Sequence, residues 1–566
     1  MNIRDEEKTR LAQRKPHSEI VISLICATTG RLVLKVRDLT KESGLYVRKS
    51  SGLIRNVSAN DALIANLLGM GILVNIFWVV YASASYPGAD LTATVFTALA
   101  VNLLVAYVYW MLSSAMPRTG GDYVWVGRII HPSLAFMVNA VFVVIMITWA
   151  GLFPYLAVAF KLQMMFTNLA ITTGDQSYAG LATALGDPNT IFIVGAVIVT
   201  LVILTMFLSV KNLFRVLIAL FAVQAVIFVI FIGMMLTTNN AAFVAGFNAK
   251  SGTTIDSILT EGTNLLGSPI TFTAEATAVG LVYTMLSFIG YANSAYFASE
   301  VKGDPRRSQG LAIFVSPIIF AVLIYVLYAS IYNVFGHDFL VSSALLFVNG
   351  KSPLPAMPSP AYLISFITDN PILALLIPFG LFLNDIGFAI VYFFVPTRNI
   401  FAWAFDRVIP VKFASVDKRG VPYYAVILYS IIAYFSLWVT VYTTWFSYMY
   451  YSNFGWWIAA AIVMFAAAIF PYRRKDIFTS SPKIVTYKIG PVPLITIVGV
   501  VGIFLSLFIS YSTILPSYNG FPINPIYVVS MLFVMVAALI IYAISYFYQK
   551  SRGVPVELAS MELPPI

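Results

Sequence analysis

The sequence predicts an all-α integral membrane protein with twelve transmembrane helices, and three observations support this fold class. First, 60 % of the 566 residues are hydrophobic and only 10 % are charged, whereas soluble proteins carry about 25 % charged residues. Second, twelve apolar segments have the length of about 20 residues that crosses a bilayer core of ~30 Å. Third, the basic residues gather in alternate connections between these segments.

The twelve predicted spans follow one another along most of the chain. Their approximate bounds are 61–84, 91–115, 133–160, 190–209, 213–236, 275–299, 310–334, 371–396, 422–443, 453–471, 492–514 and 524–547. The fourth and fifth spans are separated only by residues 210–212, so charge and length decide their division. Two long connections, 237–274 and 335–370, are rich in Gly, Ser, Thr, Asn and Pro, which fits either lids over a vestibule or solvated connectors.

The positive charges divide unequally between the two sets of connections. The set that includes both termini holds 31 of the 34 Lys and Arg residues, and the other set holds Lys161, Lys250 and Lys351. Because positive charge resists translocation, we expect both termini to be cytoplasmic. The net charge of +10 then reflects topology and contact with anionic lipid, and we expect no nucleic-acid partner.

Rare residue types exclude several kinds of site. The single cysteine, Cys26, excludes a disulfide framework and a cysteine-based metal site. The three histidines are far apart, and Gly350-Lys351-Ser352 lacks the preceding glycine of a phosphate-binding loop. We therefore expect no metal, no cofactor and no enzymatic activity, and no repeated filter sequence indicates a channel.

The first and sixth predicted spans each contain a weak point near mid-membrane. Gly69 and Gly71 interrupt the first span, and Ser287 and Gly290 interrupt the sixth. Glycine weakens a helix by ~1 kcal/mol, and a backbone group freed in hydrocarbon needs a partner. Corresponding breaks in two five-span sets indicate a substrate site at the membrane midplane. The alternative is that these small residues only permit close helix packing.

Such breaks have a definite chemistry. Unwinding leaves amide donors at the start of one half-helix and carbonyl acceptors at the end of the other. The amides and the positive end of the helix dipole attract a carboxylate, and the carbonyls accept hydrogen bonds from an ammonium group. A zwitterionic amino acid satisfies both sets of groups.

Four stretches in fixed order carry a family resemblance. They are GMGIL at 69–73, PRTGGDY at 117–123, SFIGY at 287–291 followed by SEVKGDPRR at 299–307, and RNIFA at 398–402 followed by DRVIP at 406–410 and GVP at 420–422. On these stretches the chain resembles the amino acid–polyamine–organocation (APC) superfamily. The resemblance covers residues 60–425 and leaves the eleventh and twelfth spans without a motif.

The resemblance implies a 5+5 inverted repeat with discontinuous helices 1 and 6, plus two extra C-terminal helices. The expected domains are a basic cytoplasmic extension (1–59), a transporter domain (60–548) and a cytoplasmic tail (549–566). Within the transporter domain we expect repeat one at about 60–236, repeat two at about 275–471, and helices 11 and 12 at about 492–547.

The resemblance also implies how main-chain groups hold a substrate. Amides around Met70 and Gly71 are expected to take the substrate carboxylate. Carbonyls near Leu67, Leu286 and Ile289 are expected to take the amine.

Aromatic and small residues complete the implied site. Phe288 or Tyr291 is expected to cover the substrate, with a role as plain core aromatics as the alternative. Ala292 stands where relatives often carry an acid, which favours neutral amino acids as substrates. The full predicted set is Leu67, Gly69, Met70, Gly71, Leu286, Phe288, Ile289, Gly290, Tyr291 and Asn293.

The eighth span contains two polar residues, Asn384 and Asp385, inside an apolar run. A carboxylate inside a membrane costs roughly 3 kcal/mol on insertion scales, so Asp385 is a candidate for coupling or for amine recognition, unless it lies hydrated at the outer mouth. No Ser or Thr occurs from Leu381 to Pro396. A sodium ion therefore finds few hydroxyl ligands there, which favours proton coupling or exchange.

Charged residues near the cytoplasmic ends of the spans are candidates for gating. Glu300 is expected to pair with Arg306 or Arg307, and Arg398 with Asp406. Solvated surface charges that contribute little are the alternative.

These observations predict a secondary active transporter, or permease, of the cell membrane. It would move amino acids or related amines by alternating access, coupled to protons or by exchange. The alternative is a membrane amino-acid sensor of transporter descent that binds without net flux, with the basic extension as its output. The predicted partners are a small-molecule substrate and the lipid bilayer.

Overall fold

The computed structural model describes residues 51–444, 449–514 and 525–554 of the chain. Most of the predicted extension at 1–59 and of the predicted tail at 549–566 lies outside these residues. The described part is built almost entirely from helices. Its one sheet is a two-stranded antiparallel ribbon of β1 (Lys488–Ile489) and β2 (Val492–Pro493), in which Lys488 lies opposite Pro493.

Eleven helical spans in the described residues are long and apolar enough to cross a membrane, which confirms the all-α membrane fold class. They correspond to the predicted spans with the exception of the sixth. In chain order they are α2 (Ala59–Met70) with α3 (Asn75–Ser85), α4 (Leu91–Ala115), α6 (Pro132–Leu156) with η1 (Ala157–Leu162) and α7 (Gln163–Thr173), α9 (Pro188–Met206), α10 (Val210–Thr237), α14 (Pro305–Gln309) with η4 (Gly310–Val315) and α15 (Ser316–Phe335), α18 (Pro371–Phe405), α19 (Tyr423–Tyr442), α20 (Met449–Arg473), α22 (Leu494–Ser512) and α24 (Pro525–Ser551).

The sixth predicted span is missing from that set because it is interrupted. Its first part, α13 (Ala274–Ser287), has only 14 residues. The chain then continues as two 3₁₀ segments, η2 (Ile289–Tyr296) and η3 (Ala298–Glu300). Spans 1 and 6 are therefore both discontinuous, as the sequence predicts. The inverted relation of the two five-span sets stays a prediction.

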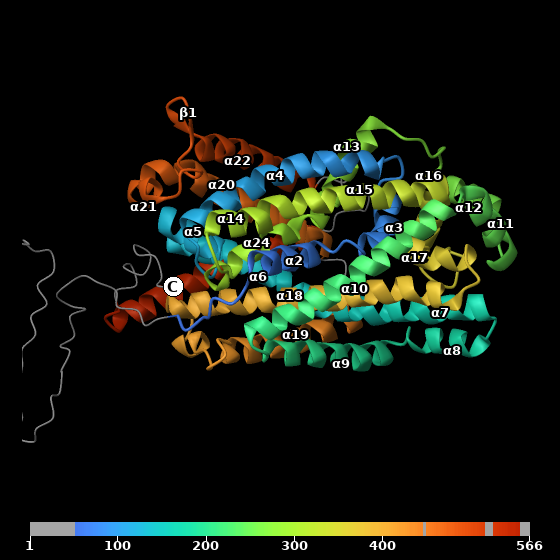
Figure 1. Ribbon diagram of the computed structural model, residues 1–566, viewed down its shortest axis with the longest axis horizontal. Coiled ribbons are helices and arrows are strands. Elements are labelled where there is room, and N and C mark those ends of the chain that lie inside the picture. Colours follow the sequence, from blue (N-terminus) through green and yellow to red (C-terminus); the bar gives the residue numbers. More distant parts are fainter. Residues whose placement is uncertain (1–50, 445–448, 515–524, 555–566) are drawn as a thin grey trace, which may run out of the picture. The chain divides into compact units, whose positions relative to one another are not determined.

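Short elements mark two ends of the helical bundle (Figure 1). We call one the basic end. It carries α5 (Asp122–Ile129), α14, η6 (Val411–Ala414), α21 (Lys475–Ser480) and the β1–β2 ribbon. The opposite end carries α8 (Gln176–Ala184), α11 (Asn240–Lys250), α12 (Ile255–Leu266), α16 (His337–Val348), α17 (Pro360–Leu363) and η5 (Ile364–Phe366).

The two long connections of the sequence are more ordered than predicted. Both contain helices, and α12 packs against α16. Their polar residues act as helix caps: Asn239 accepts a hydrogen bond from the amide of Ala242, and Thr254 accepts one from the amide of Ser257. A composition that suggests a loop thus also supplies the caps that begin a helix.

The third span differs most from its prediction. The helix runs for 42 residues from Pro132 to Thr173, about 63 Å at 1.5 Å per residue, and is wound as a π-helix over η1. Lys161 was predicted in an outer connection, and that prediction is wrong. It lies within η1 and is fully buried, because the helix continues after the apolar run ends.

Candidate functional site

The break in the first span is a sharp change of backbone direction at Gly71. This residue has φ 67°, and its N–H donates to the carbonyl of Leu67 at 3.0 Å, which closes the end of α2. Glycine adopts this left-handed conformation without a steric penalty. Among the described residues, the backbone N–H groups of 72–74 have no backbone acceptor. The turn before α3 therefore holds unpaired amide donors.

The break in the sixth span lies directly against the first. A Cβ atom on Gly290 would lie 2.1 Å from the carbonyl carbon of Gly69 and 2.4 Å from the nitrogen of Met70. No side chain fits between two backbones at that distance. The two interrupted spans thus touch at Gly69 and Gly290.

Two asparagines hold the broken segments together. The Asn66 side chain donates to the carbonyls of Tyr291 and Ala312 and accepts from the amide of Ser294 at 2.9 Å. Its side chain therefore stabilises the 3₁₀ winding of η2 from the first span.

Asn75 acts in the same way on the other side of the break. It donates to the carbonyl of Gly71 at 2.8 Å and accepts from the hydroxyls of Ser287 and Tyr328 at 3.0 and 3.2 Å. Buried polar side chains are usually satisfied. Here the partners that satisfy Asn75 include one main-chain group freed by the interruption, the carbonyl of Gly71.

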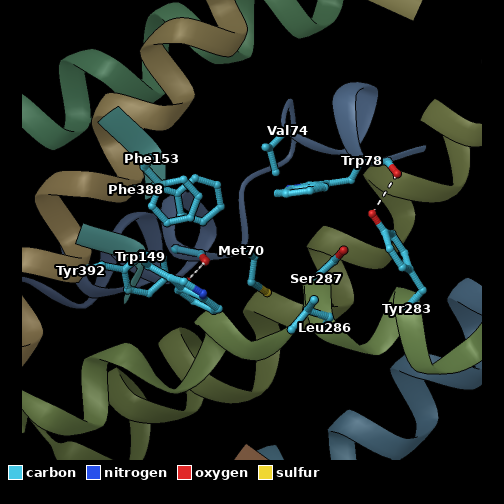
Figure 2. Close-up of a pocket in the computed structure, with 11 residues that line it drawn as sticks. Met70, Val74, Trp78, Trp149, Phe153, Tyr283, Leu286, Ser287, Phe388 and Tyr392 are labelled. Carbon is cyan, nitrogen blue, oxygen red and sulfur yellow. Dashed lines mark hydrogen bonds between the residues drawn. The ribbon is translucent and has the colours of Figure 1, made fainter. Parts of the chain in front are cut away.

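A cavity lies beside the two breaks (Figure 2). The space open to the centre of a water molecule is about 50 Å³, enough for a few water molecules. No Asp, Glu, Lys, Arg or His is among the eleven described residues that line it. They are Gly69, Met70, Val74, Trp78, Trp149, Phe153, Tyr283, Leu286, Ser287, Phe388 and Tyr392.

Aromatic rings form most of the cavity wall. The rings of Phe153 and Phe388 are stacked with centroids 4.5 Å apart and an angle of 2° between planes, and the ring of Tyr392 continues the stack. The hydroxyl of Tyr283 donates to the carbonyl of Trp78 at 2.9 Å (Figure 2). The cavity is therefore mostly apolar on its sides, with a few neutral polar groups, such as the Ser287 hydroxyl, and the interrupted backbones.

The predicted substrate residues fall into three groups. Gly69, Met70 and Leu286 line the cavity. Gly290 and Ile289 lie in the 3₁₀ break and do not line it.

The third group differs from the prediction. The Leu67 carbonyl and the Gly71 amide were expected to bind opposite ends of a substrate, but they bind each other. Phe288 packs edge-on against Phe320, and Tyr291 is fully buried; neither lines the cavity. The physical reason is the 3₁₀ winding after Ser287, which turns residues 289–296 into the protein core.

Asn293 is buried against the first break, with its side-chain nitrogen 2.2 Å from the position that a Gly69 Cβ would occupy. Asn384 and Asp385 are also buried and lie outside the cavity lining. Asp385 is paired with Lys161, Oδ2 to Nζ at 3.1 Å, and both side chains are 0 % exposed. The alternative of a hydrated Asp385 at the mouth of the span is therefore wrong.

A polar network joins the end of the sixth span to α18 and to the chain before α2. Arg398 donates to both carboxylate oxygens of Glu300, at 2.9 and 3.1 Å. The amide of Val57 donates to the carbonyl of Glu300, and the amide of Lys302 donates to the carbonyl of Val57. The chain before α2 is thus tied to the end of the sixth span.

The predicted partners of these charges were wrong. Glu300 pairs with Arg398 and not with Arg306 or Arg307, and Asp406 pairs with Arg128 at 2.9 Å. Sequence proximity favours neighbours such as Asp304 and Arg306, which do pair with each other at the surface. The buried pairs join residues about 100 and 280 positions apart, which spacing alone does not predict.

A second buried carboxylate also bonds to the sixth span. Asp122 in α5 accepts hydrogen bonds from Asn139 at 2.7 Å and from the Tyr296 hydroxyl at 2.8 Å. Burial raises the pKa of the Asp122 carboxyl from 3.8 to about 6, and these two hydrogen bonds oppose the rise. Asp122 is therefore poised to change charge at mildly acidic pH.

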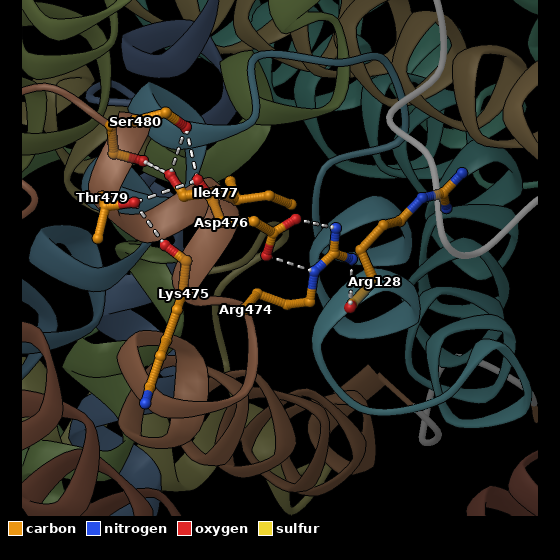
Figure 3. A network of polar contacts seen from close by, with 8 residues as sticks. Arg128, Arg474, Lys475, Asp476, Ile477, Thr479 and Ser480 are labelled. Carbon is orange, nitrogen blue, oxygen red and sulfur yellow. Dashed lines mark hydrogen bonds and ion pairs between the residues drawn. The ribbon is translucent and has the colours of Figure 1, made fainter. Parts of the chain in front are cut away.

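The end of α5 is anchored in turn by the segment after α20. Arg474 donates to the carbonyl of Arg128 at 3.0 Å and forms an ion pair with Asp476 at 2.9 Å (Figure 3). This contact connects α5 to the segment that directly follows the tenth span.

Sequence reasoning missed the aromatic lining of the cavity. The signal was present as two i, i+4 aromatic pairs, Trp149 with Phe153 and Phe388 with Tyr392. Residues four apart lie on one face of a helix. Two such aromatic faces, one in span 3 and one in span 8, would have allowed the prediction that both spans line one aromatic cavity.

Comparisons with known proteins agree with this architecture. A family model described as "Amino acid permease" matches residues 61–539, most of the chain. The chain is also 30 % identical over 79 residues to uncharacterized protein 399 of Sulfolobus islandicus rod-shaped virus 1. That match covers 14 % of this chain and 20 % of the viral protein, so no functional argument is drawn from it.

Proposed function

This chain belongs to the amino acid permease family, a family of transporters, and on that premise we propose that it moves a neutral amino acid by alternating access. The observation that supports the proposal best is the contact of two interrupted spans beside a cavity. Unpaired amides in the turn at 72–74 suit a substrate carboxylate. The carbonyl of Leu286, which lines the cavity, suits its ammonium group.

The cavity lining supports a neutral substrate with an apolar side chain. A charged substrate side chain would lose its hydration and find no opposite charge among the lining residues, which is costly in an apolar environment. The aromatic rings offer dispersion contacts instead. We therefore expect large apolar amino acids to bind more tightly than lysine, arginine, aspartate or glutamate.

The charge distribution supports an orientation with the basic end in the cytoplasm of a cell-membrane protein. Lys161 is buried within a helix, so only Lys250 and Lys351 remain at the opposite end among the described residues. The asymmetry in positive charge between the two ends is thus stronger than the sequence suggested. In this orientation Glu300 and Arg398 close the cytoplasmic path to the cavity.

We propose that transport is coupled to protons or proceeds by exchange. The run from Leu381 to Pro396 offers no Ser or Thr hydroxyl to a sodium ion, and Asp385 and its neighbour Asn384 are the proposed coupling residues. A sodium gradient at fixed pH and voltage is then expected to leave uptake unchanged. Uptake that grows with the sodium gradient would contradict this part of the proposal.

Flux of radiolabelled amino acids into proteoliposomes tests the proposal. A prior screen of the twenty amino acids by thermal unfolding selects the ligand, because a bound ligand raises stability by RT ln(1 + [L]/Kd). We expect accumulation of the selected amino acid inside the vesicles. Binding without flux would favour the sensor, and absence of both would overturn the proposed function.

A further inference from the structure

A lysine and an aspartate are buried together next to the cavity. The Nζ atom of Lys161 lies 3.1 Å from Oδ2 of Asp385. Among the described residues the Asp385 carboxylate has no other hydrogen-bond partner. Charged residues inside a membrane protein are costly and usually functional, so we expect this pair to have a function.

The ammonium group also has an aromatic partner. Nζ of Lys161 lies 3.5 Å from the centroid of the Phe77 ring, and Phe77 is fully buried. A cation over an aromatic face is attracted by the ring quadrupole, most strongly when water is excluded. Lys161 is therefore held between a carboxylate on α18 and a ring on α3.

The three residues lie close to the cavity wall. Trp78, which follows Phe77, lines the cavity, and so does Phe388, one helical turn from Asp385. The ion pair joins η1 to α18. The contact of the ammonium group with the Phe77 ring, together with the packing of Phe160 on the same ring, connects η1 to α3. α3 is the half-helix that follows the break in the first span.

We propose that Lys161 is a positioning residue for transport, acting as a latch that holds α3, and with it Trp78, over the cavity. The inference rests on the proposed function, because a latch matters only if the cavity opens toward this end. Asp385 fixes the Lys161 ammonium group in place, and the ammonium group binds the face of the Phe77 ring. When α3 moves away, water reaches the ammonium group and replaces the ring contact.

The winding of the helix supports this role. Lys161 lies in the π-helical segment η1, and π-helical turns are rare and often found at functional sites. Stability alone does not account for the pair, because a buried ion pair is often no more stabilising than apolar residues of similar size.

The test measures how readily the cavity is reached from outside. In a Cys26→Ser background, a Ser287→Cys substitution places one thiol in the cavity wall. The probe is a membrane-impermeant cationic thiosulfonate added outside right-side-out vesicles, and the readout is the rate of thiol modification. Protection of the same thiol by the amino acid selected above reports on the proposed function independently of the latch.

Two variants remove the latch by different routes. Phe77→Leu removes the ring and keeps an apolar side chain. Lys161→Met combined with Asp385→Asn removes the ammonium group without leaving an unpaired charge. Each is expected to raise the modification rate about tenfold, equivalent to ~1.4 kcal/mol and within the range of a desolvated cation–π contact.

Phe160→Leu is the matched control. Phe160 packs edge-on against Phe77 with ring centroids 5.3 Å apart, so its loss perturbs the same cluster without removing the ammonium contact. We expect the parent rate in this variant. An unchanged rate in the double variant, or an equal rise in Phe160→Leu, would overturn the latch. Either result would leave the proposed function intact if the substrate still protects the thiol.

Discussion

The two proposed closures of the cavity are built from different chemistry. The basic-end closure consists of two buried pairs, the hydrogen bond of Tyr296 to Asp122 and the ion pair of Arg398 with Glu300. The opposite-end closure consists of the stacked rings of Phe153 and Phe388, and of Trp78 with Tyr283, which one hydrogen bond joins.

This difference indicates how each end opens. Directional bonds between buried charges hold one geometry and are lost together, since a charge without its partner is strongly disfavoured. Ring contacts are individually weak and tolerate small displacements. We therefore expect the opposite end to open more readily, and the basic end to open in a single cooperative step.

The largest predicted effect comes from breaking the ion pair of the basic-end closure. Glu300→Gln leaves the Arg398 guanidinium buried without its carboxylate. Removing one partner of a buried pair costs about 3–5 kcal/mol, so we expect a marked fall in unfolding temperature. We also expect faster modification of Ser287→Cys in inside-out vesicles.

Two controls distinguish the loss of the buried Glu300–Arg398 ion pair from the loss of a charge in general. Glu300→Leu combined with Arg398→Met removes both charges and is expected to recover much of the lost stability. Asp304→Asn breaks a surface pair with Arg306 and is expected to change little. Equal destabilisation by all three changes would contradict the role of the buried pair.

The next effect concerns pH at the same closure. Because the pKa of the Asp122 carboxyl is raised from 3.8 to about 6, the folded state binds more protons than the unfolded state between these values. Asp122 therefore stabilises the fold most below pH 3.8, and this contribution is lost as pH rises through about 6. This rise in pKa corresponds to ~3 kcal/mol of folding free energy at most.

Thermal unfolding between pH 4 and pH 7 checks this prediction. The stability of Asp122→Asn should fall less than that of the parent as pH rises through this window. Parallel curves for the two proteins would show that Asp122 does not titrate in the folded state as described.

The third effect tests the close contact between the two interrupted spans at Gly69 and Gly290. Gly290→Ala places a methyl group 2.1 Å from the carbonyl carbon of Gly69, so the interrupted spans must separate. We expect a loss of about 1–3 kcal/mol in unfolding free energy and strongly reduced uptake in proteoliposomes.

Gly233→Ala in α10 is the matched control for that change. A Cβ atom there meets no atom within 4 Å, and alanine is the better helix former. We expect unchanged uptake. Normal uptake by Gly290→Ala would show that close contact of the breaks is not required.

The smallest effect belongs to the opposite-end closure. Tyr283→Phe removes the hydrogen bond to the Trp78 carbonyl, worth about 1 kcal/mol. We expect about a fivefold faster modification of Ser287→Cys from outside and little change from inside. Tyr442→Phe, which removes a hydrogen bond to Asn189 away from the cavity, should leave both rates unchanged.

The sequence allowed part of this account to be predicted, for physical reasons. Spans depend on the length of an apolar run, and breaks depend on residues such as Gly71 that helices disfavour. Both are local properties, and both predictions agree with the structure.

The remaining features depend on contacts between distant segments. Lys161 was misplaced because a helix need not stop where its apolar run stops. The partners of Glu300 and Asp406 were misassigned because sequence distance does not show which helix ends meet. The residues that form the cavity walls follow from the packing of spans 3 and 8 against the breaks, which no single segment specifies.

Hydrogen–deuterium exchange at the backbone amides of residues 72–74 tests the central claim most directly. The claim is that main-chain groups at the interrupted spans bind the amino acid. With the amino acid selected by thermal unfolding at saturation, we expect exchange at 72–74 to slow markedly while α22 stays unchanged. Unchanged exchange at 72–74 in a protein that demonstrably takes up that amino acid would contradict the account.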